Sequence, residues 1–191
     1  MMILTNYLQK KVYMPDIQSI LLQINPNANI AFHTFYIDNN NVEALVAGHQ
    51  VAINALDFSS DVPFLFDRVC RKENIPVLHP YNIGWAGLVT VLKPDSPHIS
   101  IISKTGDDFE LKMVDYVIQY NKNRRTPQKW MEDVVQAYKN EKTENPVHPQ
   151  LSVASWIAGG LCTQILFHLC TGKPVKTFPK FYFSSILNDN N

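Results

Sequence analysis

The sequence lacks the patterns that mark several common kinds of catalytic and metal site. Its three cysteines, Cys70, Cys162 and Cys170, include no C-x-x-C pair, and its six histidines include no H-x-x-x-H or H-E-x-x-H spacing. No serine lies in the G-x-S-x-G turn of a nucleophile elbow. We therefore expect no zinc cofactor and no hydrolase of the nucleophile-elbow type.

An excess of charge of one sign is lacking as well. Lys and Arg number 17, and Asp and Glu also number 17, so the formal net charge is +0. A neutral chain has no overall electrostatic attraction for nucleic acid or for an anionic membrane, and we predict neither as a partner. The odd number of cysteines and the absence of a secretory signal peptide predict a reducing, cytoplasmic location.

No uninterrupted hydrophobic run is long enough to require a membrane. The most apolar stretch, "SVASWIAGGLCTQILFHLC" (152–170), is broken by Ser, Gly, Thr, Gln and His. It is typical of a buried helix in a soluble protein, in which Cys162 and Cys170 act as small hydrophobic residues of the core. The hydrophobic fraction of 46% argues for a folded chain.

The elements that are present alternate between helix and strand. Apolar residues at intervals of three and four predict helices, and β-branched and aromatic runs predict strands. This order indicates an α/β fold with a parallel core, later antiparallel strands and C-terminal helices. We expect an α/β core at 1–103 and, on the same domain, a helical extension at 104–191. The expected helices cover 12–24, 41–48, 59–70, 108–120, 127–139 and 152–170. The expected strands cover 30–37, 51–56, 75–81, 86–94 and 98–103, and the chain closes with an extended segment at 175–183.

Glycine is scarce where a nucleotide-binding sheet needs it. A Rossmann unit begins with a strand that leads into a glycine-rich turn, whose amides and following helix dipole hold phosphates. The seven glycines nowhere form G-x-G-x-x-G after a strand. The pattern therefore predicts an incomplete Rossmann-like sheet without a phosphate-binding loop of its own.

Four stretches nevertheless resemble one family of nucleotide-using enzymes. They are "INPNANI" (24–30), "NVEALVAGHQVAINALD" (41–57), "IPVLHPYNIGWAGLVTVLKP" (75–94) and "WIAGGLCTQILFHLCTGKPV" (156–175). In order and content they resemble the ThiF/MoeB family, the bacterial relatives of ubiquitin-activating enzymes, over the part that follows the glycine-rich ATP loop. The resemblance implies adenylation, with Mg-ATP, of the C-terminal carboxylate of a ubiquitin-like or sulfur-carrier protein, usually by a homodimer.

The resemblance also implies roles for particular residues. Asp57, at the end of the strand predicted at 51–56, would help to hold magnesium and triphosphate, as the catalytic, ATP-binding and metal-binding residue. On the sequence alone, a helix-capping or turn aspartate is an equally good interpretation. Lys11 would contact the nucleotide, and Gly84, Trp85 and Gly87 would lie beside the incoming tail of the carrier protein.

The chain departs from the family pattern around Asp57. Phe58 and Ser59 stand where the family has Asn and its neighbour, and the nearest following arginine is Arg68. The glycine-rich loop would precede residue 1, so we expect ATP use to be impaired in this chain. Alternatively, the chain is a fragment of a longer enzyme, or a partner supplies the missing half. A noncatalytic relative that binds a carrier protein or another subunit is the alternative. His79, near the end of a predicted strand, is compatible with a ligand-facing role, but a hydrogen-bonded structural histidine is favoured.

Overall fold

The computed structural model describes residues 2–5, 14–106, 108–140 and 150–187, and the side chains of 2–5 and 14–16 are not described. By its contacts the chain divides into two compact units, Met1–Gln50 and Val51–Asn191. The domain boundary predicted after residue 103 falls inside the second unit and stays a prediction. Each unit is described by itself.

The first unit is a small parallel α/β element. Strand β1 (Met2–Thr5) pairs with β2 (Ile30–His33) in parallel, and helix α1 (Met14–Ile24) lies between them in the chain. A parallel pair needs such a crossover connection. Helix α2 (Val42–Val46) follows and buries the side chains of Val42, Leu45 and Val46.

The second unit is built on a four-stranded sheet in the order β3-β4-β5-β6. Strands β3 (Ala52–Ile53) and β4 (Val77–Ile83) are parallel, connected through helix α3 (Val62–Lys72). Strands β5 (Ala86–Leu92) and β6 (Phe181–Ser185) extend the sheet in antiparallel fashion. This mixture of parallel and antiparallel pairs confirms the predicted fold class.

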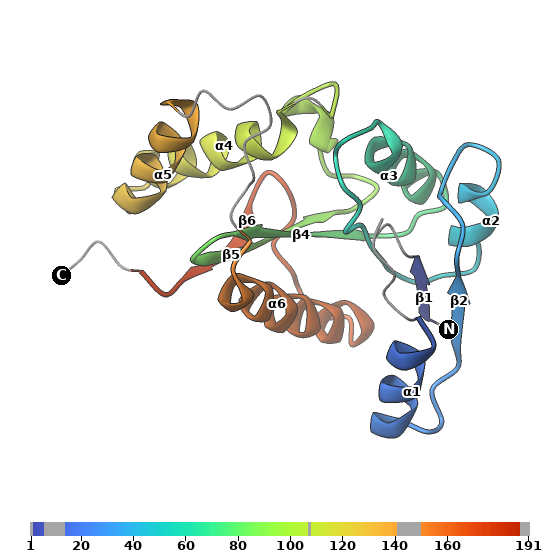
Figure 1. Ribbon diagram of the computed structural model, residues 1–191. Coiled ribbons are helices and arrows are strands. Elements are labelled where there is room, and N and C mark those ends of the chain that lie inside the picture. The colour runs from blue at the N-terminus through green and yellow to red at the C-terminus, as the bar shows by residue number, and fades with distance from the viewer. Residues whose placement is uncertain (1, 6–13, 107, 141–149, 188–191) are drawn as a thin grey trace. The chain divides into compact units, whose positions relative to one another are not determined.

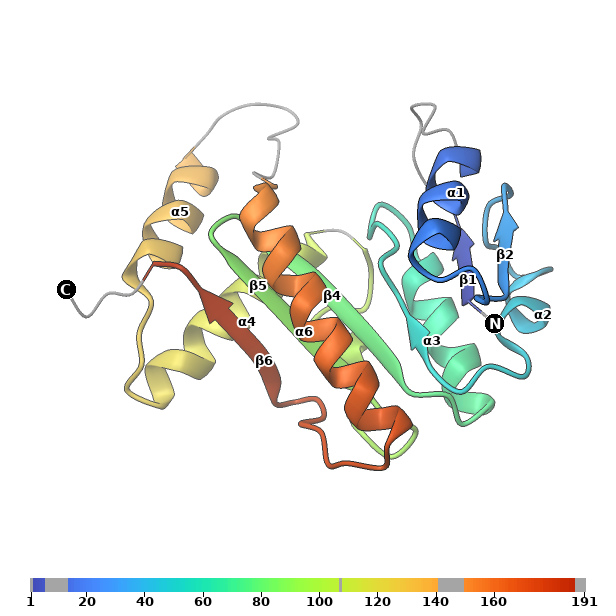
Figure 2. The same ribbon diagram turned by 90° about the horizontal axis from the view of Figure 1, so that it is seen from below.

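Helices cover both faces of this sheet. Helix α6 (Ser152–Cys170) lies along one face, and α4 (Phe109–Asn123) lies over the other, with α5 (Lys129–Asn140) packed beside α4 (Figure 1 and Figure 2). Leu78, Val89 and Val91 of the sheet form a buried cluster with Cys162 and Ile165 of α6. By length and composition alone, α6 could also cross a membrane. Cys162 is buried as predicted, whereas Cys170 is exposed, so its assignment to the core was wrong.

Three strand predictions differ from the structure. The strand predicted at 30–37 ends at His33. The segment predicted as a strand at 98–103 instead forms a short 3-10 helix at Ile99–Ile101, because the Nδ1 of His98 accepts the Ser100 N–H (3.1 Å). The edge of β5 that such a strand could have used is paired with β6. The strand predicted at 51–56 ends early, at Ile53. After it, the Leu56 N–H donates to the side-chain Oδ1 of Asn54 (3.3 Å) instead of to a neighbouring strand.

Candidate functional site

Asp57 lies in an exposed loop that follows β3. Its Oδ1 accepts the N–H of Ser59 at 3.0 Å, and the carboxylate has no further hydrogen-bond partner among the residues that the structure describes. This loop leaves the sheet at the carboxyl end of β3, where Ile53 pairs with Leu78 near the start of β4. Ligands of open α/β sheets bind outside the carboxyl ends of the strands.

The chemistry of this carboxylate fits a magnesium ion that is held mainly by phosphates. Magnesium prefers oxygen ligands and commonly uses one or two carboxylates together with waters and substrate phosphates. Within the described ranges, no group of three or more His, Cys, Asp and Glu side chains could hold a metal ion. Asp57 could therefore contribute one ligand to a magnesium ion that arrives with a nucleotide.

Phe58, the residue that follows Asp57, anchors the loop. The ring of Phe58 is buried and stacks on that of Phe109 at 3.9 Å between centroids, while Phe64 meets both rings edge-on at 5.4 Å. Gly106 lies against the same loop, and its N–H donates to Oδ1 of Asp61 at 3.3 Å. The backbone of Asp57 is thus anchored although its side chain is exposed.

A buried polar cluster lies directly behind this loop. Asn54, Asp67 and His79 are 3%, 3% and 0% exposed. Oδ1 of Asp67 accepts a hydrogen bond from Nδ2 of Asn54 (3.0 Å) and lies 2.8 Å from Nε2 of His79. An ionised carboxylate only accepts, so this contact places the imidazole proton on Nε2. The preference for a hydrogen-bonded structural His79 is thereby confirmed.

Neither Asp67 nor Asn54 was among the site residues predicted from the sequence. Helix α3 buries Phe64, Phe66, Val69 and Cys70, and Asp67 falls on the same face. An acid within an apolar helical face must find a buried donor, and this signal could have identified Asp67. Asp67 also affects the pKa values of neighbouring groups. Burial, which is the larger cause, and the charge of Asp67, which is the smaller one, raise the pKa of the Cys70 thiol to about 12. The same two causes, in the same order of size, raise the pKa of Tyr81.

The β4–β5 hairpin holds the residues predicted to contact a carrier tail. Gly84 has a φ of 60°, which favours glycine, and its N–H donates to Oδ1 of Asn82 (3.1 Å). Trp85 is exposed at the tip. Gly87 contacts α6, because a Cβ there would lie 2.6 Å from the Ala158 nitrogen. Helix packing therefore accounts for the glycine at 87, and carrier binding by these residues stays a prediction.

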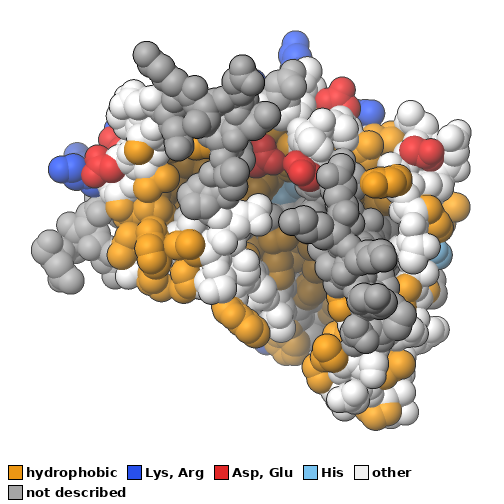
Figure 3. All heavy atoms as spheres, in the orientation of Figure 1, with side chains coloured by type: hydrophobic (Ala, Val, Ile, Leu, Met, Phe, Trp, Pro, Cys, Tyr) orange, Lys and Arg blue, Asp and Glu red, His pale blue; other side chains and the backbone are white. Residues whose placement is uncertain are grey.

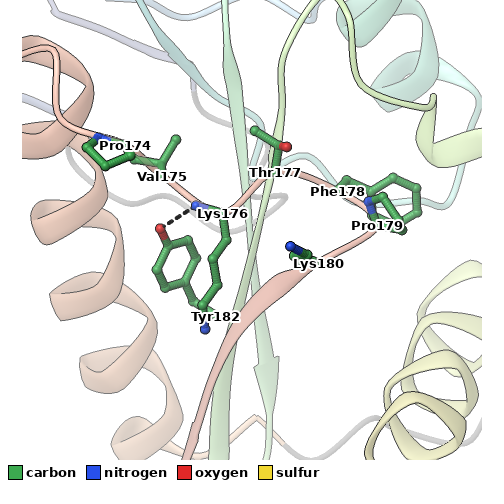
Figure 4. Close-up of a pocket in the computed structure, with 8 residues that line it drawn as sticks. All are labelled: Pro174, Val175, Lys176, Thr177, Phe178, Pro179, Lys180 and Tyr182. Carbon is green, nitrogen blue, oxygen red and sulfur yellow. Dashed lines mark hydrogen bonds between the residues drawn. The ribbon is translucent and has the colours of Figure 1, made fainter. Parts of the chain in front are cut away.

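Lys11, which was predicted to contact the nucleotide, lies outside the described residues. A pocket of about 460 Å³ is formed by the loop between α6 and β6, where the N–H of Lys176 donates to the hydroxyl of Tyr182 at 2.7 Å (Figure 4). None of the predicted site residues lines it. The pocket is lined by Pro174, Val175, Lys176, Thr177, Phe178, Pro179, Lys180 and Tyr182.

Comparison with known proteins assigns the family. The model of the ThiF family matches residues 9–190, which is nearly the whole chain. The chain belongs to the ThiF family. The resemblance inferred from the four quoted stretches is thereby confirmed.

Relatives of this ThiF chain cover only parts of it or extend well beyond it. It is 34% identical over 74 residues to "SAMP-activating enzyme E1" of Haloferax volcanii, an alignment that covers 39% of this chain and 27% of that protein. The solved structure "Crystal Structure of SeMet PaaA" is similar in fold, with a TM-score of 0.51 and 16% identity, over 88% of this chain and 50% of that one. The ThiF chain thus spans about half or less of the length of these relatives.

Proposed function

We propose that this chain contributes to the adenylation of a carrier protein by a ThiF-type enzyme. In that reaction the C-terminal carboxylate of a ubiquitin-like or sulfur-carrier protein attacks the α-phosphorus of ATP, and pyrophosphate leaves. Membership of the ThiF family supports the reaction class. The single observation that carries the proposal is the exposed Asp57 carboxylate in the loop that follows the carboxyl end of β3.

Within unit Val51–Asn191, residues at two places would take part in the reaction. Asp57 would contribute an oxygen ligand to the magnesium ion, which supplies positive charge beside the ATP phosphates. The hairpin tip at Gly84 and Trp85 lies at the carboxyl end of β4, beyond the part of β4 that pairs with β3, and would contact the extended tail of the carrier. Lys11 would contact the nucleotide.

A noncatalytic role is the alternative, and two observations favour it. The sequence has no G-x-G-x-x-G pattern, whose amides would hold a triphosphate, and no arginine follows Asp57 before Arg68. In this role the chain would bind a carrier protein or another subunit without using ATP. Binding of Mg-ATP by the chain separates the two proposals.

Replacing Asp57 by asparagine is expected to weaken Mg-ATP binding roughly tenfold, which corresponds to about 1.4 kcal/mol. The reason is that an amide oxygen carries no charge to set against magnesium. Isothermal titration calorimetry of the full chain measures this affinity. Asp133→Asn, the same change at an exposed site on α5, serves as the control and should leave the affinity unchanged. No binding heat from the unsubstituted chain would leave the noncatalytic role.

We also propose that the chain forms a homodimer through the exposed side of α6. Trp156 and Phe167 are 82% and 54% exposed on this helix, which contains no Lys, Arg, Asp or Glu over its 19 residues. Hydrophobic side chains reach the surface over α6, whereas charged side chains lie mostly toward α3, α4 and α5 (Figure 3). An uncharged surface matches a second copy of itself without leaving any buried charge unpaired.

Replacing Trp156 by lysine is expected to convert this dimer into a monomer, because the ammonium group would be buried without a partner. Light scattering at micromolar concentration measures the mass of the chain with and without the substitution. Gln119→Lys adds the same charge to an exposed site on α4 and should leave the dimer intact. A monomer before substitution, or binding of the unsubstituted chain to neutral lipid vesicles through α6, would contradict the proposal.

A further inference from the structure

The loop that carries Asp57 is closed by one buried amide side chain. Asn54 stands at the start of this loop, and its Nδ2 donates to the carbonyl oxygen of Pro63, where α3 begins, at 3.0 Å. Its Oδ1 accepts the N–H of Leu56 at 3.3 Å. Asn54 therefore joins both ends of the segment 55–62 and fixes the backbone that leads directly to Asp57.

The orientation of Asn54 is in turn set by Asp67. The second hydrogen on Nδ2 of Asn54 is donated to Oδ1 of Asp67 at 3.0 Å. A rotated amide group would place its oxygen against the carboxylate, which is unfavourable in a buried site. Asp67 thus selects the one orientation in which Asn54 can bind Pro63 and Leu56 together.

His79 holds Asp67 and also contacts the other side of the loop. Its Nε2 lies 2.8 Å from Oδ1 of Asp67, and its ring is stacked near Phe58 (6.3 Å) and Tyr81 (6.2 Å). Phe58 directly follows Asp57 in the chain. The side chains of Asn54 and Phe58, which stand on either side of Asp57 in the chain, therefore lie against the Asp67–His79 pair.

Packing alone does not explain these polar residues. A buried polar pair loses its hydration, and apolar residues of similar volume often stabilise a fold as well or better. Here Oδ2 of Asp67 and Nδ1 of His79 are buried without any hydrogen-bond partner in the structure as described. What the pair supplies is a fixed direction for Asn54, which an apolar pair could not supply.

We propose that Asp67 and His79 are positioning residues that act through Asn54 to hold the turn at Asp57 in one conformation. The purpose assigned to this turn, directing the Asp57 carboxylate toward magnesium and nucleotide, rests on the proposed function. The restraint that Asp67 and His79 place on the turn is a separate property of the chain, and it can be measured without any ligand.

Hydrogen exchange of two backbone amides tests the hold directly. The Leu56 N–H is bonded to Asn54, and the Ser59 N–H is bonded to Asp57. We expect His79→Asn, whose side chain is too short to reach Asp67, to speed the exchange of both amides by about tenfold, because local opening becomes easier. His79→Gln places an amide nitrogen near the position of Nε2 and should restore exchange to within about twofold of the unsubstituted chain.

A control and a second variant make the result decisive. Amides of β5, such as those of Val89 and Val91, lie in the paired sheet and should exchange at unchanged rates in every variant. If His79→Asn does not fold, Asp67→Asn replaces it: this variant keeps an acceptor for Asn54 but loses the charge, and it should speed exchange at Leu56 and Ser59 in the same direction.

The inference is overturned if His79→Asn or Asp67→Asn leaves exchange at Leu56 and Ser59 unchanged. It is equally overturned if His79→Gln and His79→Asn loosen the β5 amides to the same extent, because the histidine would then serve general packing. The Asp57→Asn calorimetry decides the proposed function separately. Unchanged Mg-ATP binding there, together with faster exchange in His79→Asn, would refute the role of Asp57 in metal binding but not the hold on its turn.

Discussion

Replacing Gly106 by alanine is expected to lower the free energy of unfolding by about 3 kcal/mol. The added Cβ would overlap the carbonyl oxygen of Phe58 and would lie 2.9 Å from that of Ser60. Both contacts are to backbone, and Phe58 cannot move away because its ring is packed against Phe109 and Phe64. The substitution must therefore displace the loop that carries Asp57.

Urea denaturation followed by tryptophan fluorescence measures this loss. The three tryptophans, Trp85, Trp130 and Trp156, all lie in unit Val51–Asn191, so their fluorescence reports the unfolding of the unit that contains Gly106. In a protein of this size the melting temperature falls by about 2–4 °C for each kcal/mol. A loss below about 0.5 kcal/mol, the usual range for surface substitutions, would show that the loop and Gly106 do not approach so closely.

Much of the fold could be predicted because it depends on local patterns. Helices α3 and α6 were predicted from the pattern of apolar residues within each segment. The structure has both helices where they were expected. The strand predicted at 98–103 is absent for two reasons, of which the hydrogen bond from the Ser100 N–H to His98 is local and the other lies elsewhere in the chain. The position beside β5 that this strand could have occupied is taken by Phe181–Ser185, and no local sequence pattern predicts that pairing.

The candidate site was only partly visible in the sequence for the same reason. Asp57 stood out because it follows an apolar run, but its anchoring depends on Asp67 and His79, which lie 10 and 22 positions further along the chain. A hydrogen bond between a helix and a neighbouring strand can join residues at any separation in the sequence, so residue spacing does not predict it. The one local signal was an acid on the apolar face of α3, which required a buried donor without saying which.

Replacing Gly87 by alanine is expected to cost a similar free energy of unfolding, about 3 kcal/mol, by separating α6 from the sheet. The new Cβ would lie 2.6 Å from the Ala158 nitrogen and 2.7 Å from Cγ2 of Ile157. Helix α6 cannot simply move outward, since Nδ2 of Asn82 binds its first turn through the Leu151 carbonyl oxygen and the Ser155 hydroxyl, each at 2.9 Å. The same denaturation experiment measures the effect.

Gly159 provides the matched control for both glycine substitutions. It lies within α6, and a Cβ there would meet nothing within 4 Å. Gly159→Ala should therefore raise the free energy of unfolding by about 1 kcal/mol, because alanine favours a helix interior over glycine. Opposite signs at Gly87 and Gly159 would show that close helix–strand contact, and not glycine content, sets the stability of this layer. A stabilising Gly87→Ala would contradict this packing and would leave binding of a carrier tail as the remaining reason for a glycine at that position.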